Sequence, residues 1–263
     1  MRPSAARSSS GVLAPGWDGA GAAPVSLMAT AWTTRAVDVR QTVPVPSDTD
    51  DGHRLLGEWL RHLHRLAPAV SREHLEAVGV DLLGRYGEPH RAYHDASHLA
   101  EVLTAVELLA DHADDLPVVV AAAWWHDAVY DVRATPGRNE ADSAELAERV
   151  LGGWSVEPRR VARVGALVRM TAAHDPALGD RDGELLSDAD LAVLAAAPER
   201  YARYVADVRR EYAHVPDADF AAGRTEVLRE LLAHDRLYRT PEGAERWEQA
   251  ARDNLARELA ALR

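Results

Sequence analysis

The chain has 263 residues, 47% of them hydrophobic and 27% charged, which is typical of a globular protein with one large domain or two small ones. It contains no cysteine, which excludes disulfides, zinc–thiolate sites and a cysteine nucleophile. The formal net charge of −12 argues against binding to a nucleic acid duplex. The longest apolar run has eight residues, too few for a membrane span, and no signal peptide is recognisable, so we expect a cytoplasmic protein without a membrane partner.

Residues 1–50 are rich in Ser, Gly, Ala, Pro and Thr and show no sustained hydrophobic periodicity. Such a segment buries too little apolar surface to offset the entropy lost on ordering, so we expect a disordered extension. Residues 51–263 have the pattern of one globular domain. Its first two helices are expected from Leu55 to Leu66, where Leu and Trp recur at helical spacing, and from Ser71 to Gly87.

The rest of the chain also shows helical periodicity, and no pair of strand patterns accompanies it. The segment 116–129 is apolar on nearly all sides and is therefore expected at the centre of the fold. The sequence predicts an all-α, single domain of about nine to ten helices. The further helices are expected at 93–111, 116–129, 139–150, 158–174, around 185–194, 198–212, 216–232 and 247–262.

His126 and Asp127 directly follow the apolar run 118–125. An unpaired charge buried there would cost several kcal/mol, so such a pair normally has polar partners or a metal ion. The alternative interpretation is a helix end at which the chain turns back to water. The doublet alone does not decide between these two interpretations.

Other potential ligands precede and follow this doublet. His94 and His98 are four residues apart and are expected on one face of the helix over 93–111. Asp188 and Asp190 follow about 60 residues after the doublet. One histidine, the His-Asp doublet and one late aspartate give four nitrogen and oxygen ligands. Such a set suits one divalent metal ion: Mn²⁺, Fe²⁺, Mg²⁺, Ni²⁺ or Zn²⁺.

The two late aspartates are two residues apart, about 200° around a helix, so both cannot face one ion. Asp190 falls near the centre of the apolar stripe formed by Leu186, Val193 and Leu194 and is the favoured ligand. Asp188 falls on the opposite side, where it or Ser187 is expected to cap the start of the helix, and it remains the alternative ligand.

The ordered set of motifs resembles the metal-dependent HD phosphohydrolase superfamily, and within it a bacterial group described as predicted metal-dependent HD phosphohydrolases. The resemblance extends from about Leu55 to the C-terminus and implies an all-α fold. One departure is Asp95, which stands where related phosphodiesterases have Asn. The motifs are Tyr93-His94-x-x-x-His98, Trp125-His126-Asp127-x-x-Tyr130-Asp131, Asn139-Glu140-x-x-Ser143-Ala144, Asp188-Ala189-Asp190-Leu191, Tyr201-x-x-Tyr204 and Arg210-Glu211-Tyr212.

This resemblance implies hydrolysis of a phosphomonoester or phosphodiester of a nucleotide or small metabolite, with a metal-activated water as the nucleophile. His94 matches the histidine that protonates the leaving oxygen in the phosphodiesterases. Asp131 is a candidate for orienting the water, and a structural carboxylate near a loop is its alternative interpretation. The implied substrate contacts are Tyr93, Arg138, Asn139, Glu140 and His174, although 138–140 also fit a helix cap and His174 also fits a helix end.

Two other functions remain open at this stage. Some members of the superfamily are di-iron oxygenases, which have extra histidines between the His-Asp doublet and the last aspartate. Here only His174 lies between Asp127 and Asp188, and a single extra ligand is too few for that six-ligand set, so a mononuclear site is favoured. The other alternative is a non-catalytic domain that binds a nucleotide. The sequence leaves the oligomeric state open.

Overall fold

The computed structural model describes residues 50–262. The disordered extension expected over residues 1–50 lies outside the described residues, except for Asp50, which begins the first helix. The described part contains ten α-helices, two short 3₁₀ helices and no strand, which confirms the predicted all-α fold and the predicted number of helices. None of these helices combines the length and the apolar character needed to cross a membrane.

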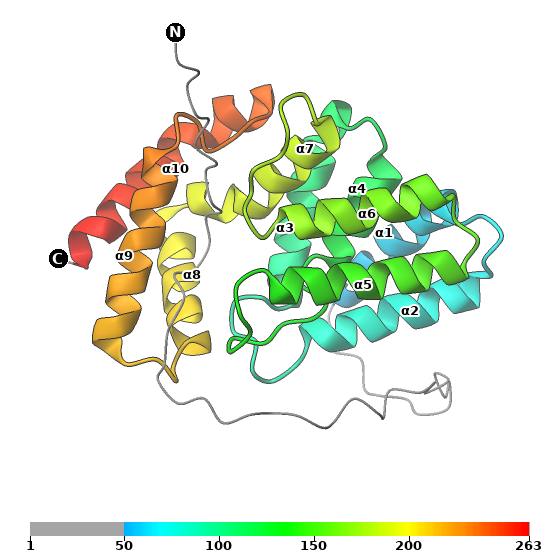
Figure 1. Ribbon diagram of the computed structural model, residues 1–263, viewed down its shortest axis with the longest axis horizontal. Coiled ribbons are helices and arrows are strands. Elements are labelled where there is room, and N and C mark those ends of the chain that lie inside the picture. The colour runs from blue at the N-terminus through cyan, green and yellow to red at the C-terminus, as the bar shows by residue number, and fades with distance from the viewer. Residues whose placement is uncertain (1–49, 263) are drawn as a thin grey trace, which may run out of the picture.

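The elements follow one another in the order that Figure 1 shows. They are α1 (Asp50–Leu66), α2 (Arg72–Tyr86), α3 (Ala96–Leu108), η1 (Ala110–His112), α4 (Leu116–Trp125), α5 (Arg138–Gly153), α6 (Pro158–Met170), α7 (Arg181–Asp190), η2 (Leu191–Ala195), α8 (Pro198–Glu211), α9 (Asp217–Ala233) and α10 (Pro241–Ala261).

Helix α4 lies at the centre of the larger hydrophobic core, as its apolar sequence predicts. Every residue from Val118 to Trp125 is buried, and the helix packs against α1, α3, α5, α6 and α7. Trp59 of α1 packs its ring 4.9 Å from that of Trp124 and 5.2 Å from that of Trp125, measured between centroids. Aromatic pairs at these separations add to the stabilisation from burial itself. Helix α4 is therefore held firmly up to the residue that precedes His126.

A second, smaller core lies between α8, α9, α10 and η2, on one side of the molecule in Figure 1. Helix α7 and η2 connect it to the larger core. Tyr201 and Tyr204 are buried in this second core, as their helical spacing predicts. The segment from α7 to η2 therefore contacts both cores.

Several helix boundaries differ from those expected, and two of the differences lie beside predicted ligands. Helix α3 begins at Ala96 because the Asp95 carboxylate caps it, accepting hydrogen bonds from the backbone N–H groups of Ser97 and His98 at 2.8 and 3.2 Å. His94 therefore precedes the helix, and the expectation that it shares a helical face with His98 is wrong. Helix α4 ends at Trp125 instead of continuing to residue 129.

Candidate metal centre

Four predicted ligands come together where three helices meet. His98 is the third residue of α3, His126 and Asp127 follow the end of α4, and Asp190 is the last residue of α7. These three helices pack directly against one another. His98 and His126 are almost completely buried, and the side chains of both aspartates are only slightly exposed, at 12 and 13%.

The donor atoms of these side chains converge on one small volume. The Nε2 atoms of His98 and His126 are 3.2 Å apart, and Asp127 Oδ2 lies 3.6 and 3.0 Å from them. Asp190 Oδ1 lies 3.2 Å from His98 Nε2 and 3.6 Å from His126 Nε2. Donors bound to one ion at about 2.1 Å lie about 3.0 Å apart in an octahedron and about 3.4 Å apart in a tetrahedron. The spacing therefore fits a common ion, and the group His98, His126 and Asp127 could hold a metal ion.

The ring orientation of His126 suits metal binding. Its Nδ1 lies 2.7 Å from the carbonyl oxygen of Ala123, which is in the last turn of α4. When Nδ1 carries the proton, it donates a hydrogen bond to this oxygen. When the ring is neutral, this tautomer leaves a lone pair on Nε2, the atom that faces the other donors. Metal-binding histidines commonly have such a partner on the second ring nitrogen, because it fixes both tautomer and orientation.

The electrostatic environment of the four groups favours a cation. Burial would lower the pKa of His126, but the charges of Asp127 and then Asp190 raise it to about 10. The pKa of each carboxyl group is held well below its usual range, because the nearby histidine charges, that of His126 foremost, outweigh burial. His126 and Asp190 also lie at the C-terminal ends of α4 and α7, where helices carry partial negative charge. A divalent cation would compete with protons for this site.

Asp188 has a different environment from Asp190. It is completely buried, and its Oδ1 and Oδ2 each accept a hydrogen bond at 2.8 Å, from the backbone N–H of Arg239 and of Thr240 respectively. Helix α7 begins at Arg181, with Asp180 as its N-cap, so Asp188 lies near the C-terminal end. The expected capping role of Asp188 or Ser187 is therefore wrong, because the polar stretch 181–184 is already helical. The structure places Asp190 among the donors.

His94 lies beside the four donors without belonging to them. Its ring centroid is 5.7 Å from that of His98, and its side chain is 24% exposed. The Nδ1 atom of His94 lies 2.7 Å from Glu211 Oε2. Burial would lower the pKa of His94, but the charge of Asp127 and the hydrogen bond to Glu211 raise it above its usual value. A proton held by Nδ1 leaves Nε2 as the atom that can exchange a proton with a ligand.

Glu211, at the end of α8, is a site residue that the sequence prediction did not assign. Its Oε1 accepts hydrogen bonds from three successive backbone N–H groups, those of residues 92–94, at 2.8 to 2.9 Å. The Tyr130 hydroxyl donates to Oε2 at 2.8 Å. Burial would raise the pKa of Glu211, but its bonds to His94 and the backbone lower it to about 2. This carboxylate therefore fixes both the loop before α3 and the ring of His94.

Three of the predicted substrate contacts lie around the start of α5. Burial and then the charge of Asp127 raise the pKa of Glu140. Asn139 bonds the backbone N–H and carbonyl of Asp131 at 3.0 and 3.1 Å, and it shapes the loop. Arg138 forms an exposed ion pair with Asp142 at 2.7 Å. The structure gives Asn139 and Arg138 structural contacts, and the contact of all three residues with a substrate stays a prediction.

Tyr93 and Asp131, also predicted, have structural contacts. The Tyr93 ring is buried and packs with its centroid 4.7 Å from that of His98 and 4.7 Å from that of Tyr204. The Tyr93 ring therefore packs against the ring of His98 and restricts its orientation. Asp131 is exposed, and its Oδ1 accepts a hydrogen bond from the backbone N–H of Arg133 at 2.8 Å. Its role in orienting a water molecule stays a prediction.

His174 lies next to the donor set, on the turn after α6. That helix ends at Met170, and His174 has a left-handed backbone with φ of 49°. Its Nε2 is 3.6 Å from Asp190 Oδ2, whereas Asp190 Oδ1 faces the other histidines. A left-handed non-glycine residue is uncommon and draws attention to function, although histidine adopts it more readily than most.

Comparisons of the chain with protein-family models, with curated proteins and with solved structures gave no match.

Proposed function

We propose that this protein is a metal-dependent phosphohydrolase that acts on a phosphomonoester or phosphodiester of a small metabolite or nucleotide. The observation that carries the proposal is the spacing of 3.0 to 3.6 Å between the donor atoms of His98, His126, Asp127 and Asp190. The resemblance of the motif order to HD phosphohydrolases supports the same class of reaction.

The four donors would hold one divalent ion, Mn²⁺, Fe²⁺, Mg²⁺, Ni²⁺ or Zn²⁺, since nitrogen and carboxylate oxygen suit all of these. Such an ion lowers the pKa of a water molecule and polarises a phosphoryl oxygen. The protein itself contributes a rigid and nearly dry frame, because each donor lies at the end or start of a packed helix. Rigid placement of this kind reduces the reorganisation needed during the reaction.

His94 is suited to give a proton to the leaving oxygen of the phosphate ester. Glu211 bonds its Nδ1 at 2.7 Å, which orients the ring and leaves Nε2 as the donating atom. In this scheme the P–O bond to the leaving group breaks, the leaving oxygen takes the Nε2 proton of His94, and a water molecule supplies the oxygen that replaces it. One proton of the water stays on the phosphate, and the other is released to solvent, from which Nε2 is protonated again. Glu211 is a positioning residue, because it acts through His94.

The test is hydrolysis of a panel of phosphate esters by protein loaded separately with each of the five ions. We expect phosphate release that stops when a chelator removes the ion and that falls at least about a hundredfold in His126→Ala. Turnover that persists in His126→Ala would contradict the proposal. Two irons per chain with oxygen consumption would replace it by a di-iron oxygenase, and nucleotide binding without hydrolysis would replace it by a binding domain.

A further inference from the structure

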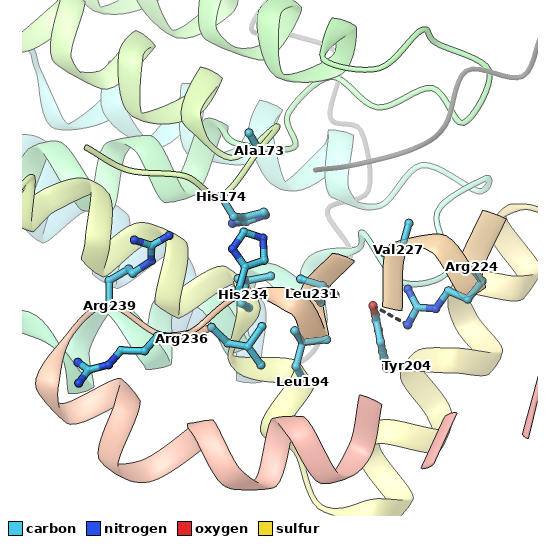
Figure 2. A pocket seen from close by; sticks show the side chains of 12 residues that line it. Ala173, His174, Leu194, Tyr204, Arg224, Val227, Leu231, His234, Arg236 and Arg239 are labelled. Carbon is cyan, nitrogen blue, oxygen red and sulfur yellow. Dashed lines mark hydrogen bonds between the residues drawn. The ribbon is translucent and has the colours of Figure 1, made fainter. Parts of the chain in front are cut away.

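A pocket adjoins the candidate metal centre, bounded by the turn after α6, η2, α9 and the connection from α9 to α10 (Figure 2). His174 belongs to both, because it lines the pocket and lies 3.6 Å from Asp190. Leu191, which directly follows Asp190, also lines it. The pocket and the donor set are therefore neighbours, which meet at His174 and at the end of α7.

The pocket wall is mainly aliphatic. Among residues 50–262, Tyr204 is the only aromatic residue other than histidine that lines the pocket. Its ring already packs against Tyr93 at 4.7 Å and under the guanidinium of Arg224 at 5.1 Å. The described lining therefore offers no free pair of aromatic faces that could stack on a nucleobase. The aliphatic lining suits the saturated carbon chain of a small molecule. Its side chains are Leu191, Leu194, Val227, Leu231 and Leu237.

Three arginines line the same pocket, but only some of their charge is compensated. Arg224 is paired with Glu258 through bonds of 2.7 and 3.0 Å. Arg239 lies 3.3 Å from Asp175, and both side chains are partly exposed, so this pair is weak. Arg236 has no ion-pair partner among residues 50–262. In Figure 2 the guanidinium of Arg239 points toward the side of His174, whereas that of Arg236 points away.

Arg239 is fixed relative to the metal centre by α7. The buried Asp188 carboxylate accepts hydrogen bonds at 2.8 Å from the backbone N–H groups of Arg239 and Thr240. Two residues further along the same helix, Asp190 contributes to the donor set. The distance between the donor set and the start of the Arg239 side chain is therefore set by one short segment of helix.

We propose that this pocket binds the body of the substrate, which is aliphatic and carries a second anionic group, a carboxylate or phosphate, bound by Arg239. The inference rests on the proposed function, since the phosphate to be hydrolysed lies at the metal centre. The second anionic group takes the place of Asp175 at the guanidinium. Arginine suits this role because its planar donors match the oxygens of a carboxylate or a phosphate.

The test uses three phosphonates with the same three-carbon body, which bind without being hydrolysed: propylphosphonate, 3-phosphonopropionate and propane-1,3-diphosphonate. Their dissociation constants are measured by titration calorimetry on the Mn²⁺-loaded full chain. We expect the better of the two doubly anionic compounds to bind about tenfold more tightly than propylphosphonate. Which of them it is identifies a carboxylate or a phosphate as the second group.

Two matched variants complete the test. Arg239→Gln should reduce the preference to about onefold. Arg246→Gln removes an arginine on the surface of α10 that is paired with Glu242, and it should retain the preference. Equal binding of all three compounds by the unaltered protein, a preference that survives in Arg239→Gln, or tighter binding of a nucleoside phosphonate would overturn the inference.

The outcome also separates the two proposals. A preference lost in Arg239→Gln, together with no hydrolysis of the matching phosphate esters, supports the pocket and contradicts the phosphohydrolase. Hydrolysis of simple esters without any such preference supports the phosphohydrolase and overturns the pocket.

Discussion

The two cores of this protein stabilise the fold by different means. The core around α4 is filled with tryptophan and aliphatic side chains, and the donor set gathers where α3, α4 and α7 meet. The core between α8, α9 and α10 encloses a charged network, in which Arg224 pairs with Glu258 and the Tyr201 hydroxyl donates to the same carboxylate at 2.5 Å. The comparison indicates that the first core positions the metal donors, whereas α8, which packs in the second core, positions Glu211 against His94.

Trp124→Ala should have the largest effect on the first core. The side chain is completely buried and packs 4.9 Å from the ring of Trp59, so its removal should lower the free energy of unfolding by about 3–5 kcal/mol. Chemical denaturation measures this change. Trp247→Ala, at the edge of both cores, is the matched control and should cost less. Equal costs for the two variants would mean that α4 is not the centre of stability.

Glu258→Gln should disturb the second core and spare the first. It leaves Arg224 buried without its ionic partner, which typically costs about 3 kcal/mol or more. We expect faster hydrogen exchange in α9 and α10, with exchange in α4 unchanged. Glu242→Gln, which breaks an exposed pair on α10, is the control and should change neither. Faster exchange in α4 of Glu258→Gln would show that the two cores unfold as one.

Glu211→Gln tests how the second core acts on the site. We expect hydrolysis to fall about a hundredfold, the usual contribution of a well-placed proton donor, with metal content unchanged. The pKa of Glu211 is lowered from 4.5 to about 2, so its contribution to stability is complete above pH 4.5 and is lost as the pH falls toward 2. The unfolding free energy of Glu211→Gln should therefore depend less on pH in this window. If the variant were as active as the unaltered protein, the positioning role of Glu211 would be contradicted.

Arg169→Ala should have the smallest effect. This residue forms a bidentate pair with Glu148 between α5 and α6, but the two side chains are 42 and 33% exposed. Exposed pairs contribute less than about 1 kcal/mol, so the midpoint of urea unfolding should hardly move. A loss comparable to that of Glu258→Gln would mean that surface charge stabilises the first core as much as burial does.

The fold and the donor set could be predicted from local patterns, because hydrophobic periodicity determines which face of each helix is buried. The run 118–125 predicted the centre of the fold, and the doublet at its end, taken together with His98 and Asp190, predicted the donor set. The predicted position of His94 within a helix was wrong, because Asp95 caps α3 and the helix begins only at Ala96. Periodicity carries no information on such a competition between side chain and backbone.

The groups that the sequence did not reveal act over long separations. Glu211 bonds the backbone of residues 92–94 from 117 to 119 positions away, and Asp188 bonds that of Arg239 from 51 positions away. Neither residue type nor spacing identifies such partners, because the contacts depend on how the second core docks on the first. For the same reason the sequence pattern offers only a ligand or a capping role for Asp188.

The most direct test of the account is the metal content of the purified chain after loading with each of the five divalent ions. The account predicts about one ion per chain in the unaltered protein, and less than about a tenth of that in His126→Ala and Asp190→Ala. His112→Gln is the matched control, because His112 is not one of the four donors and its Nε2 pairs with Glu184 at 2.9 Å. This variant should retain the ion. No bound ion in the unaltered protein, or full occupancy in His126→Ala, would contradict the account.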